Sequence, residues 1–319
     1  MTMTEDNVAV WTETSRSREL PTIFFVSGGH KSGTSWLSWM LGSHPEVLCE
    51  GAGRFVGWAH SVDAWFNEGR FRNWANYPTV QDRWMRNVDV DQAIRDAKRA
   101  MIESILRRKV EPHHRAVGDK TPMFYCRAIE RLYELFPDAK FINVIRDGRD
   151  VAVSHLFHIL RRNETEYFEN EHEAESRRRF HIDGEGAAIS LFSRKSLRLV
   201  ALNWVESMRG GQRAKELFGS NYLEIRYEDM LLDAMVIRKA FRLLGVSDDE
   251  RIARECVERH RFEVRSGGRA PGEADPGAFI RKGISGDWRH YFDDSHKAQF
   301  NRLAGDVLIE LGYEADANW

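Results

Sequence analysis

The segment Thr22–Leu41 combines a short apolar run, a glycine-rich polar loop and a helical pattern, and it constrains the fold more than any other part of the chain. Its apolar run, Ile23 to Val26, has the length of a buried strand and ends at a pair of glycines. The polar loop Lys31-Ser32-Gly33-Thr34-Ser35 follows, and a helical pattern begins near its end. A strand that passes through a tight glycine turn into a helix is typical of an α/β fold.

The loop also has the composition of a phosphate cradle. Glycines allow backbone N–H groups to point inward, and the helix N-terminus adds partial positive charge. Lys31 adds a full charge, and the hydroxyl groups of Thr34 and Ser35 add donors. The order G-x-x-x-x-G-K-[ST] of a Walker A loop is absent, so an ATP triphosphate is not the expected anion.

Two later segments supply basic residues for the same anion. Phe141 to Ile145 is another strand-length apolar run, which Arg146 closes before a helical pattern that carries Ser154. Arginine supplies a bidentate fork and serine a hydroxyl donor, so these two side chains can converge on one phosphate. Farther along the chain, Arg281-Lys282-Gly283 places two cations beside a residue that lets the backbone approach a ligand.

Together these segments resemble those of the sulfotransferases that use 3′-phosphoadenosine 5′-phosphosulfate (PAPS). Lys31-Ser32-Gly33-Thr34-Ser35-Trp36 resembles the 5′-phosphosulfate loop of that family. Val144 to Ser154 resembles its 3′-phosphate strand and helix, and Arg281 to Trp288 resembles its C-terminal motif for the same phosphate. Two weaker matches occur in the expected order, at Tyr227-Glu228-Asp229 and at the segment around Phe262, whose ring packs on adenine in the family.

The resemblance covers residues 21–292 and implies an α/β fold with a central, mainly parallel sheet and a PAPS site at the carboxyl ends of its strands. It implies PAPS as sulfuryl donor, adenosine 3′,5′-bisphosphate (PAP) as product, and no metal. The residues that it assigns to the donor are Lys31, Ser32, Gly33, Thr34, Ser35, Trp36, Arg146, Ser154, Tyr227, Phe262, Arg281, Lys282 and Gly283.

Three catalytic residues follow from the resemblance. Lys31 is expected to stabilise charge on the leaving oxygen, and Lys120 is expected near the reacting sulfate. Cytosolic small-molecule members use a histidine two residues beyond that second lysine as general base, whereas this chain has Pro122 there. Carbohydrate and tyrosyl-protein members use a glutamate shortly after the first helix. Glu50 has a similar position and is the predicted base, with His60 in reserve.

Other function classes stay open at this point. A P-loop kinase acting on a small hydroxyl substrate would need Mg²⁺ and a Walker lysine, and the loop order argues against it. The presence of Lys31 argues against a nucleotide-binding module without catalysis, whereas the missing histidine leaves that interpretation open. The expected acceptor is a hydroxyl, less readily an amine, of a small molecule or glycoside, and a carbohydrate or a protein tyrosine is the alternative.

Length and charge limit the organisation of the chain. Its 319 residues suffice for one sizeable core, so we expect a loose polar extension over 1–20 and a single domain over 21–319. Insertions on the acceptor side are expected near 51–118 and 161–192. Lys and Arg number 47 against 49 Asp and Glu, so no overall field favours nucleic acid or a membrane surface.

No window of the sequence reaches the roughly 18 apolar residues of a membrane span. Cys49, Cys126 and Cys256 have no metal-ligand spacing, and we expect reduced cysteines in a cytoplasmic protein. The oligomeric state stays open. His155, on the helix that carries Ser154, is expected to be a packing residue.

Helical periodicity over Asp89–Arg108 places Ile94, Ala97, Met101 and Ile105 on the expected buried face. Two stretches are ambiguous. The aromatic stretch 51–78 and the charged run 161–179 either cover the core or border the acceptor, the second as a lid. Further helices are predicted at Arg127–Phe136, Ser193–Phe218, Asp233–Leu244, Asp249–Arg259 and Asp294–Leu311.

Overall fold

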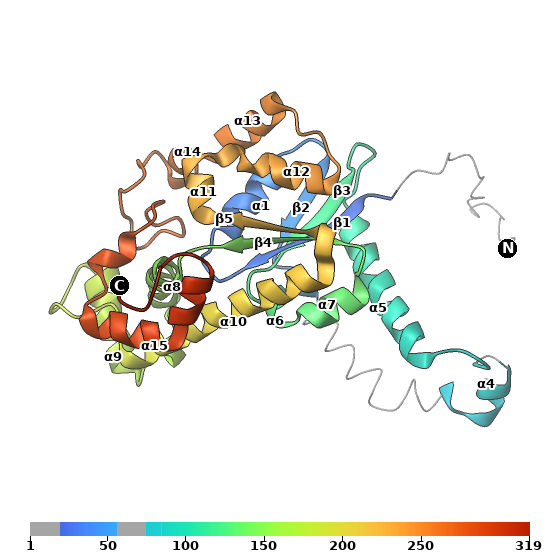
Figure 1. Cartoon of the computed structure of the whole chain (residues 1–319), viewed down its shortest axis with the longest axis horizontal. Helices are drawn as coiled ribbons and strands as arrows, with labels where there is room; N and C mark the ends of the chain where they lie inside the picture. Colours follow the sequence, from blue (N-terminus) through green and yellow to red (C-terminus); the bar gives the residue numbers. More distant parts are fainter. Residues whose placement is uncertain (1–19, 56–74, 84) are drawn as a thin grey trace, which may run out of the picture.

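The computed structural model describes residues 20–55, 75–83 and 85–319 (Figure 1). Most of the N-terminal extension, most of the aromatic stretch and His60 lie outside these residues. The strands are β1 (Thr22–Gly28), β2 (Val47–Gly51), β3 (Ala116–Lys120), β4 (Lys140–Ile145) and β5 (Tyr222–Arg226). The α-helices are α1 (Thr34–Gly42), α4 (Pro78–Arg83), α5 (Val90–Arg107), α6 (Phe124–Arg127), α7 (Ile129–Leu135), α8 (Gly148–Arg162), α9 (Glu171–Arg178), α10 (Arg194–Phe218), α11 (Tyr227–Leu232), α12 (Arg238–Leu244), α13 (Glu250–Glu258), α14 (Phe262–Ser266) and α15 (Asp294–Glu310). Short helical turns are η1 (Thr165–Tyr167), η2 (Arg179–Asp183), η3 (Gly219–Asn221), η4 (Ala234–Ile237) and η5 (Asp287–His290).

The strands form a parallel sheet in the order β2-β3-β1-β4-β5, which confirms the predicted α/β fold. From β1 in the middle, the chain moves to one side for β2 and β3 and to the other for β4 and β5. The register pairs Val26 with Lys120 and Gly28 with Val144. This reversal of direction leaves a crevice at the carboxyl ends beside β1, which is where ligands bind in open α/β sheets.

Helices cover both faces of the sheet. On one face, Phe24 and Val26 of β1 pack in a cluster with residues of α1 and α12. On the other face, Ile23 and Phe25 pack in a cluster with residues of α7 and α10. Figure 1 shows α1 and α12 on the side of the sheet opposite to α7 and α10. Burial on both faces explains why β1 has an unbroken apolar run instead of alternating apolar and polar residues.

Most of the predicted helices are confirmed to within a few residues, with corrections. The helix predicted over Arg127–Phe136 corresponds to α7, whereas the one predicted over Asp233–Leu244 is divided into η4 and α12. In α5 the predicted buried face is wrong in part, because Met101 and Ile105 are 45% and 46% exposed. The buried residues Ile94, Lys98, Ile102 and Leu106 repeat every four positions. The predicted set and the observed set each lie on one face of a helix, and the packing of α5 against α7 determines that the observed set is buried.

The charged run 161–179 is packed onto the core. It includes the end of α8, η1 and all of α9. Phe168 and Ala174 are buried in the cluster that contains residues of α8 and α10. Arg177 is 7% exposed, and its guanidinium pairs with Glu173 at 3.0 Å. These contacts pack the segment against the core, and none of its residues is among the described residues that line the cavity reported below.

The cysteines of this chain are free thiols, with Cys126 and Cys256 buried and Cys49 partly buried. In the described part of the chain, no helix has the length and apolar character needed to cross a membrane. The His, Cys, Asp and Glu side chains within the described ranges form no group of three that could hold a metal ion.

Candidate functional site

A cavity of about 280 Å³ lies at the carboxyl ends of the sheet strands. Part of its lining comes from residues at or shortly after the ends of strands, and helices and the segment around Phe279 to Ile284 supply the rest. The lining residues near the strand ends are His30, Lys31, Gly33, Thr34, Ser35, Lys120, Pro122, Arg146 and Tyr227. The cavity therefore occupies the crevice that the strand order creates.

The loop between β1 and α1 requires glycine at position 33. Gly33 has a φ of 96°, and a Cβ atom there would lie 2.5 Å from the ring of Tyr227. Glycine is therefore required by both conformation and space. Within the described residues, the buried hydroxyl of Ser32 has no hydrogen-bond partner. No side chain caps the N-terminus of α1, so its first N–H groups are available to an anion.

Lys31 lies among other cations. Its Nζ donates to the carbonyl oxygen of Phe279 at 3.2 Å and lies 4.0 Å from the centre of that ring. Burial, together with the charges of Arg161, Arg146 and Arg281, lowers the pKa of Lys31 to about 7. A bound anion would reduce the electrostatic repulsion among the cations that surround this cavity.

Arg146 connects two loops at this site. It is 8% exposed, and its Nη1 donates to the carbonyl oxygen of Lys31 at 3.0 Å. Its Nη2 donates to the carbonyl oxygen of Ile284 at 3.1 Å. The guanidinium lies 4.1 Å from the centre of the Tyr227 ring. The buried Nε has no partner among the described residues, so one charged donor is left for a ligand.

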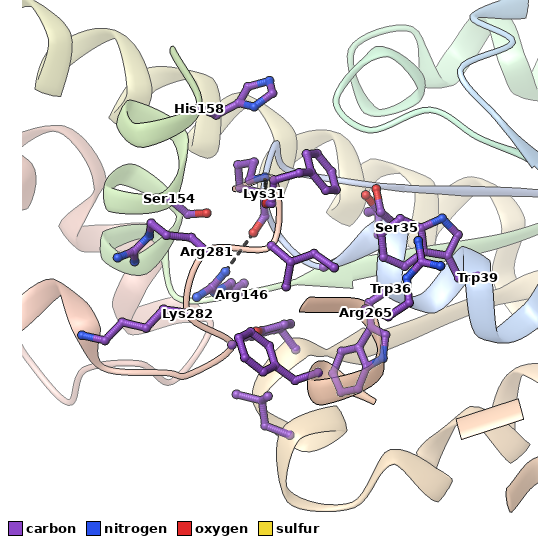
Figure 2. A pocket seen from close by; sticks show the side chains of 18 of the residues that line it. Lys31, Ser35, Trp36, Trp39, Arg146, Ser154, His158, Arg265, Arg281 and Lys282 are labelled. Carbon is purple, nitrogen blue, oxygen red and sulfur yellow. Dashed lines mark hydrogen bonds between the residues drawn. The ribbon is translucent and has the colours of Figure 1, made fainter. Parts of the chain in front are cut away.

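The C-terminal basic motif also retains unused donors. Arg281 and Lys282 donate to the two carboxylate oxygens of Asp287 at 2.5 Å and 2.6 Å. In the part of the chain that the structure describes, Nε and Nη1 of Arg281 are buried without a partner. Figure 2 shows Arg281 beside Ser154, on the same side of the cavity as Arg146. The predicted residues for the 3′-phosphate therefore lie together.

Two buried aspartates hold this basic loop, and the sequence pattern did not point to them. Asp150 on α8 accepts hydrogen bonds from the N–H groups of Gly286 at 2.6 Å and Trp288 at 2.9 Å. Asp287 is 1% exposed and pairs with both cations of the motif. Each aspartate stands within a segment that carries the predicted arginines, and an acidic residue in a basic motif was the available signal.

The other side of the cavity is aromatic. Trp36, Trp39, His260 and Phe262 line it, and Trp36 Nε1 donates to the carbonyl oxygen of His260 at 2.8 Å. Arg265 lies over the Trp39 ring at 3.8 Å from its centre. Figure 2 shows Trp36, Trp39 and Arg265 close together. Such flat walls suit a planar ring. Trp36 and Phe262 were predicted for this site, and the other three residues were not.

Gly283 shows why the basic motif ends in glycine. Its φ is 68°, and a Cβ atom there would lie 2.2 Å from the ring of Phe262. Both the left-handed conformation and the ring exclude a larger residue. Gly283 thus brings the basic loop and the aromatic wall into direct contact.

The predicted catalytic residues lie in two places. Lys120 lines the cavity at the end of β3, and its Nζ donates to the Ser35 hydroxyl at 3.3 Å. Burial lowers the pKa of Lys120. Glu50, on the edge strand β2, is absent from the described residues that line the cavity. Its carboxylate is 57% exposed and pairs with Lys109 at 2.8 Å.

Three histidines lie near the two predicted lysines. His30 and His158 line the cavity, whereas His155 is 3% exposed and packs against His30 with ring centres 4.9 Å apart. The packing role predicted for His155 is therefore confirmed. Burial, followed by nearby cations, lowers the pKa of His30 and of His158 to about 4. Both lining imidazoles are neutral at pH 7.

A sequence model described as "Sulfotransferase family" matches residues 21–250 of the chain. Protein-tyrosine sulfotransferase 2 of Gallus gallus is 32% identical over 134 residues, which are 42% of this chain and 33% of that protein. Protein-tyrosine sulfotransferase 1 of Danio rerio is 28% identical over 134 residues, which are 42% of this chain and 34% of that protein. The matched region is thus about a third of the length of these curated relatives.

Solved structures share the fold. Mouse sulfotransferase SULT7A1, complexed with PAP, matches with a TM-score of 0.51 and 18% identity, over 90% of this chain and 84% of that one. The sulfotransferase domain of the Synechococcus PCC 7002 olefin synthase matches with a TM-score of 0.50 and 19% identity, over 92% of this chain and 97% of that one. At these identities the likeness concerns the fold.

Proposed function

Because this chain belongs to the sulfotransferase family, we propose that its cavity binds PAPS and that its residues direct the sulfuryl group to a hydroxyl of an acceptor. The observation that carries this proposal is the set of buried donors of Arg146 and Arg281 that lack partners among the described residues. A buried donor without a partner costs about 1–3 kcal/mol, and more for a charged group. A phosphate in this cavity would satisfy these donors.

The two sides of the cavity fit the parts of the donor. On the basic side, Arg146, Ser154 and Arg281 would hold the 3′-phosphate by charge-assisted hydrogen bonds. The loop around Lys31, with the N-terminus of α1, would hold the 5′-phosphosulfate. The aromatic side, with Trp36, would hold the adenine ring.

Transfer of this kind depends on positioning and on stabilisation of charge. Lys31 would stabilise the negative charge that develops on the leaving phosphate oxygen. Lys120, which reaches the Ser35 hydroxyl at the start of α1, would stabilise the oxygens of the moving sulfuryl group. Two lysines would then supply the charge that Mg²⁺ supplies in kinases.

For the acceptor we propose the hydroxyl of a small molecule or glycoside. Arg54 stands 4.9 Å from the centre of the Phe124 ring, and Arg161 stands 5.8 Å from that of Phe279. Together these residues would provide apolar and cationic contacts for a ring-bearing or anionic body. The second candidate is a protein tyrosine, which is favoured by the partial similarity to the tyrosyl-protein enzymes of Gallus gallus and Danio rerio.

The test is a labelling screen with ³⁵S-labelled PAPS. The full chain is incubated without added metal against a library of alcohols and glycosides and, in parallel, against acidic tyrosine peptides. Transfer to library alcohols or glycosides is expected. Transfer to the peptides alone would show that the acceptor is a protein tyrosine. Phosphoryl transfer from Mg-ATP without any transfer from PAPS would show that the chain is a kinase and contradict the proposed reaction. The Lys31→Ala variant is the matched inactive control.

A further inference from the structure

His30 is part of the cavity lining. It stands directly before Lys31, two residues after Gly28, which ends the central strand β1. It borders the cavity together with Lys31 and Lys120, the residues expected around the reacting sulfate. An acceptor hydroxyl that attacks the sulfate from this side would meet the imidazole.

We propose that His30 is the general base that accepts the proton of the acceptor hydroxyl. The inference rests on the proposed sulfuryl transfer and names the residue that activates its acceptor. A base must lie within hydrogen-bond reach of the proton that it takes and must be unprotonated when it does so. His30 lines the same cavity as both lysines, where an acceptor hydroxyl would reach its ring, and burial together with the surrounding cations meets the second requirement.

Cations face His30 from several elements. After burial, its pKa is lowered by Arg127 on α6, Lys31 in its own loop, Arg54 after β2 and Lys120 on β3. Burial and this field keep the imidazole neutral at pH 7, with a lone pair free to accept a proton. The negative charges of a bound donor oppose the same field, so donor binding raises the pKa of His30 toward the range in which a base is efficient.

A buried partner fixes the ring. His155 on α8 packs against His30 with 30° between the ring planes. The ring of Tyr167 packs in turn against His155, with ring centres 5.7 Å apart. Burial lowers the pKa of His155 as well, so this neighbour adds no positive charge. The pair therefore holds the His30 imidazole in place by contact between neutral rings.

The proposed step balances without another reactant. A bond forms between the acceptor oxygen and sulfur while the bond from sulfur to the bridging phosphate oxygen breaks. The electron pair of the broken bond stays on that phosphate oxygen, which Lys31 stabilises. The acceptor proton moves to a ring nitrogen of His30, and solvent takes it from the imidazolium after product release.

The other candidates for the general base, Glu50 and His158, are less suitably placed. The exposed carboxylate of Glu50 pairs with Lys109 outside the cavity lining. His158 lines the cavity, but its Nδ1 lies 3.0 Å from Nη2 of Arg161 and is engaged there. In the described residues, no such hydrogen bond involves the ring of His30.

The first experiment compares His30→Gln with wild type on the acceptor found by the labelling screen. We expect kcat to fall by about 10²–10⁴-fold, as for loss of a general base, with PAP affinity by calorimetry within about threefold of wild type. The acidic limb of the wild-type kcat profile should vanish in the variant. His113→Gln, an exposed histidine outside the cavity lining, is the matched control and should keep wild-type kcat.

A second measurement needs neither an acceptor nor an active variant. The ring of His30 is titrated by NMR in ¹³C-histidine-labelled protein, with the signal assigned from His30→Gln or, if that protein does not fold, from His30→Asn. PAP should raise the His30 pKa from its value in the free protein. An unchanged pKa in protein that binds PAP, or a kcat within threefold of wild type for His30→Gln, would overturn the role of His30. A large loss in Glu50→Gln with none in His30→Gln would give the role to Glu50. Absence of PAP binding by wild type would instead remove the proposed function.

Discussion

Nη1 of Arg146 donates a hydrogen bond of 3.0 Å to the carbonyl oxygen of Lys31. The residue that would hold the 3′-phosphate thus also fixes the loop that would hold the 5′ end of the donor. The same guanidinium reaches the carbonyl oxygen of Ile284, beside the C-terminal basic motif. One buried side chain therefore links three segments that are far apart in the sequence, so donor binding and loop geometry would depend on it together.

Replacement of Arg146 by lysine should weaken PAP binding by roughly 10- to 100-fold. A lysine keeps the charge but loses the planar fork, and a hydrogen bond to a charged group contributes about 1.5–3 kcal/mol. Isothermal titration calorimetry measures the effect. The control is Arg213→Lys, since Arg213 forms exposed ion pairs with Glu130 and Glu216. Equal losses in the two variants, or none in Arg146→Lys, would contradict this role.

Gly283→Ala should reduce PAP affinity by at least about tenfold, because the new methyl group would force the Phe262 ring out of the cavity wall. Gly184→Ala is the matched control. Gly184 has a φ of 73°, close to the 68° of Gly283, but nothing lies within 4 Å of its Cβ position. The backbone strain is then common to both variants and the clash is not. PAP affinity and thermal unfolding are measured for both, and equal affinities would rule out the clash as the cause.

PAP binding should depend on pH through Lys31. In the free protein its pKa is about 7, and the anion favours the charged lysine, so the pKa rises on binding. Affinity should therefore be highest below pH 7 and fall as the pH rises through 7 and above. Calorimetry at pH 8 in two buffers of different ionisation enthalpy should detect proton uptake on binding. Lys31→Arg, whose side chain stays charged, should abolish the uptake, and an unchanged uptake would assign it to another group.

Lys31→Ala should lower turnover by more than about 10²-fold, as for loss of a group that stabilises transition-state charge. The reaction itself should continue in excess EDTA, since Lys31 and Lys120 supply the charge that Mg²⁺ supplies in kinases. Rates are measured with the acceptor identified by labelling. Loss of wild-type activity in EDTA with recovery on addition of Mg²⁺ would contradict the assignment to lysines.

The basic side of the cavity could be predicted from the sequence because each of its parts is local. The loop around Lys31 and the strand that ends at Arg146 combine a strand, a turn and a helix start within a few residues, and these patterns are readable along the chain. Arg281 lies far away in sequence, but its neighbours Lys282 and Gly283 make the motif recognisable. The parallel sheet then brings the carboxyl ends of these strands together.

The remaining residues of the cavity depend on tertiary contacts that no local pattern records. His30 is one side chain in a glycine-rich loop, and its relation to His155 on α8 appears only in the fold. Trp39 on α1 and Arg265 on α14 are in contact although they are far apart in the sequence. The prediction for α5 placed Met101 and Ile105 on the buried face, whereas the neighbouring residues Ile102 and Leu106 are buried. Both faces fit the sequence pattern, and only tertiary packing selects between them.

The central claim is that the unpaired donors of Arg146 and Arg281 hold the 3′-phosphate of PAPS and of its product. Calorimetric titration of the wild-type chain with PAP and with AMP, which differ only in that phosphate, tests it most directly. Each charge-assisted hydrogen bond contributes about 1.5–3 kcal/mol, so PAP should bind at least about tenfold more tightly than AMP. Equal affinity for the two nucleotides would contradict the account.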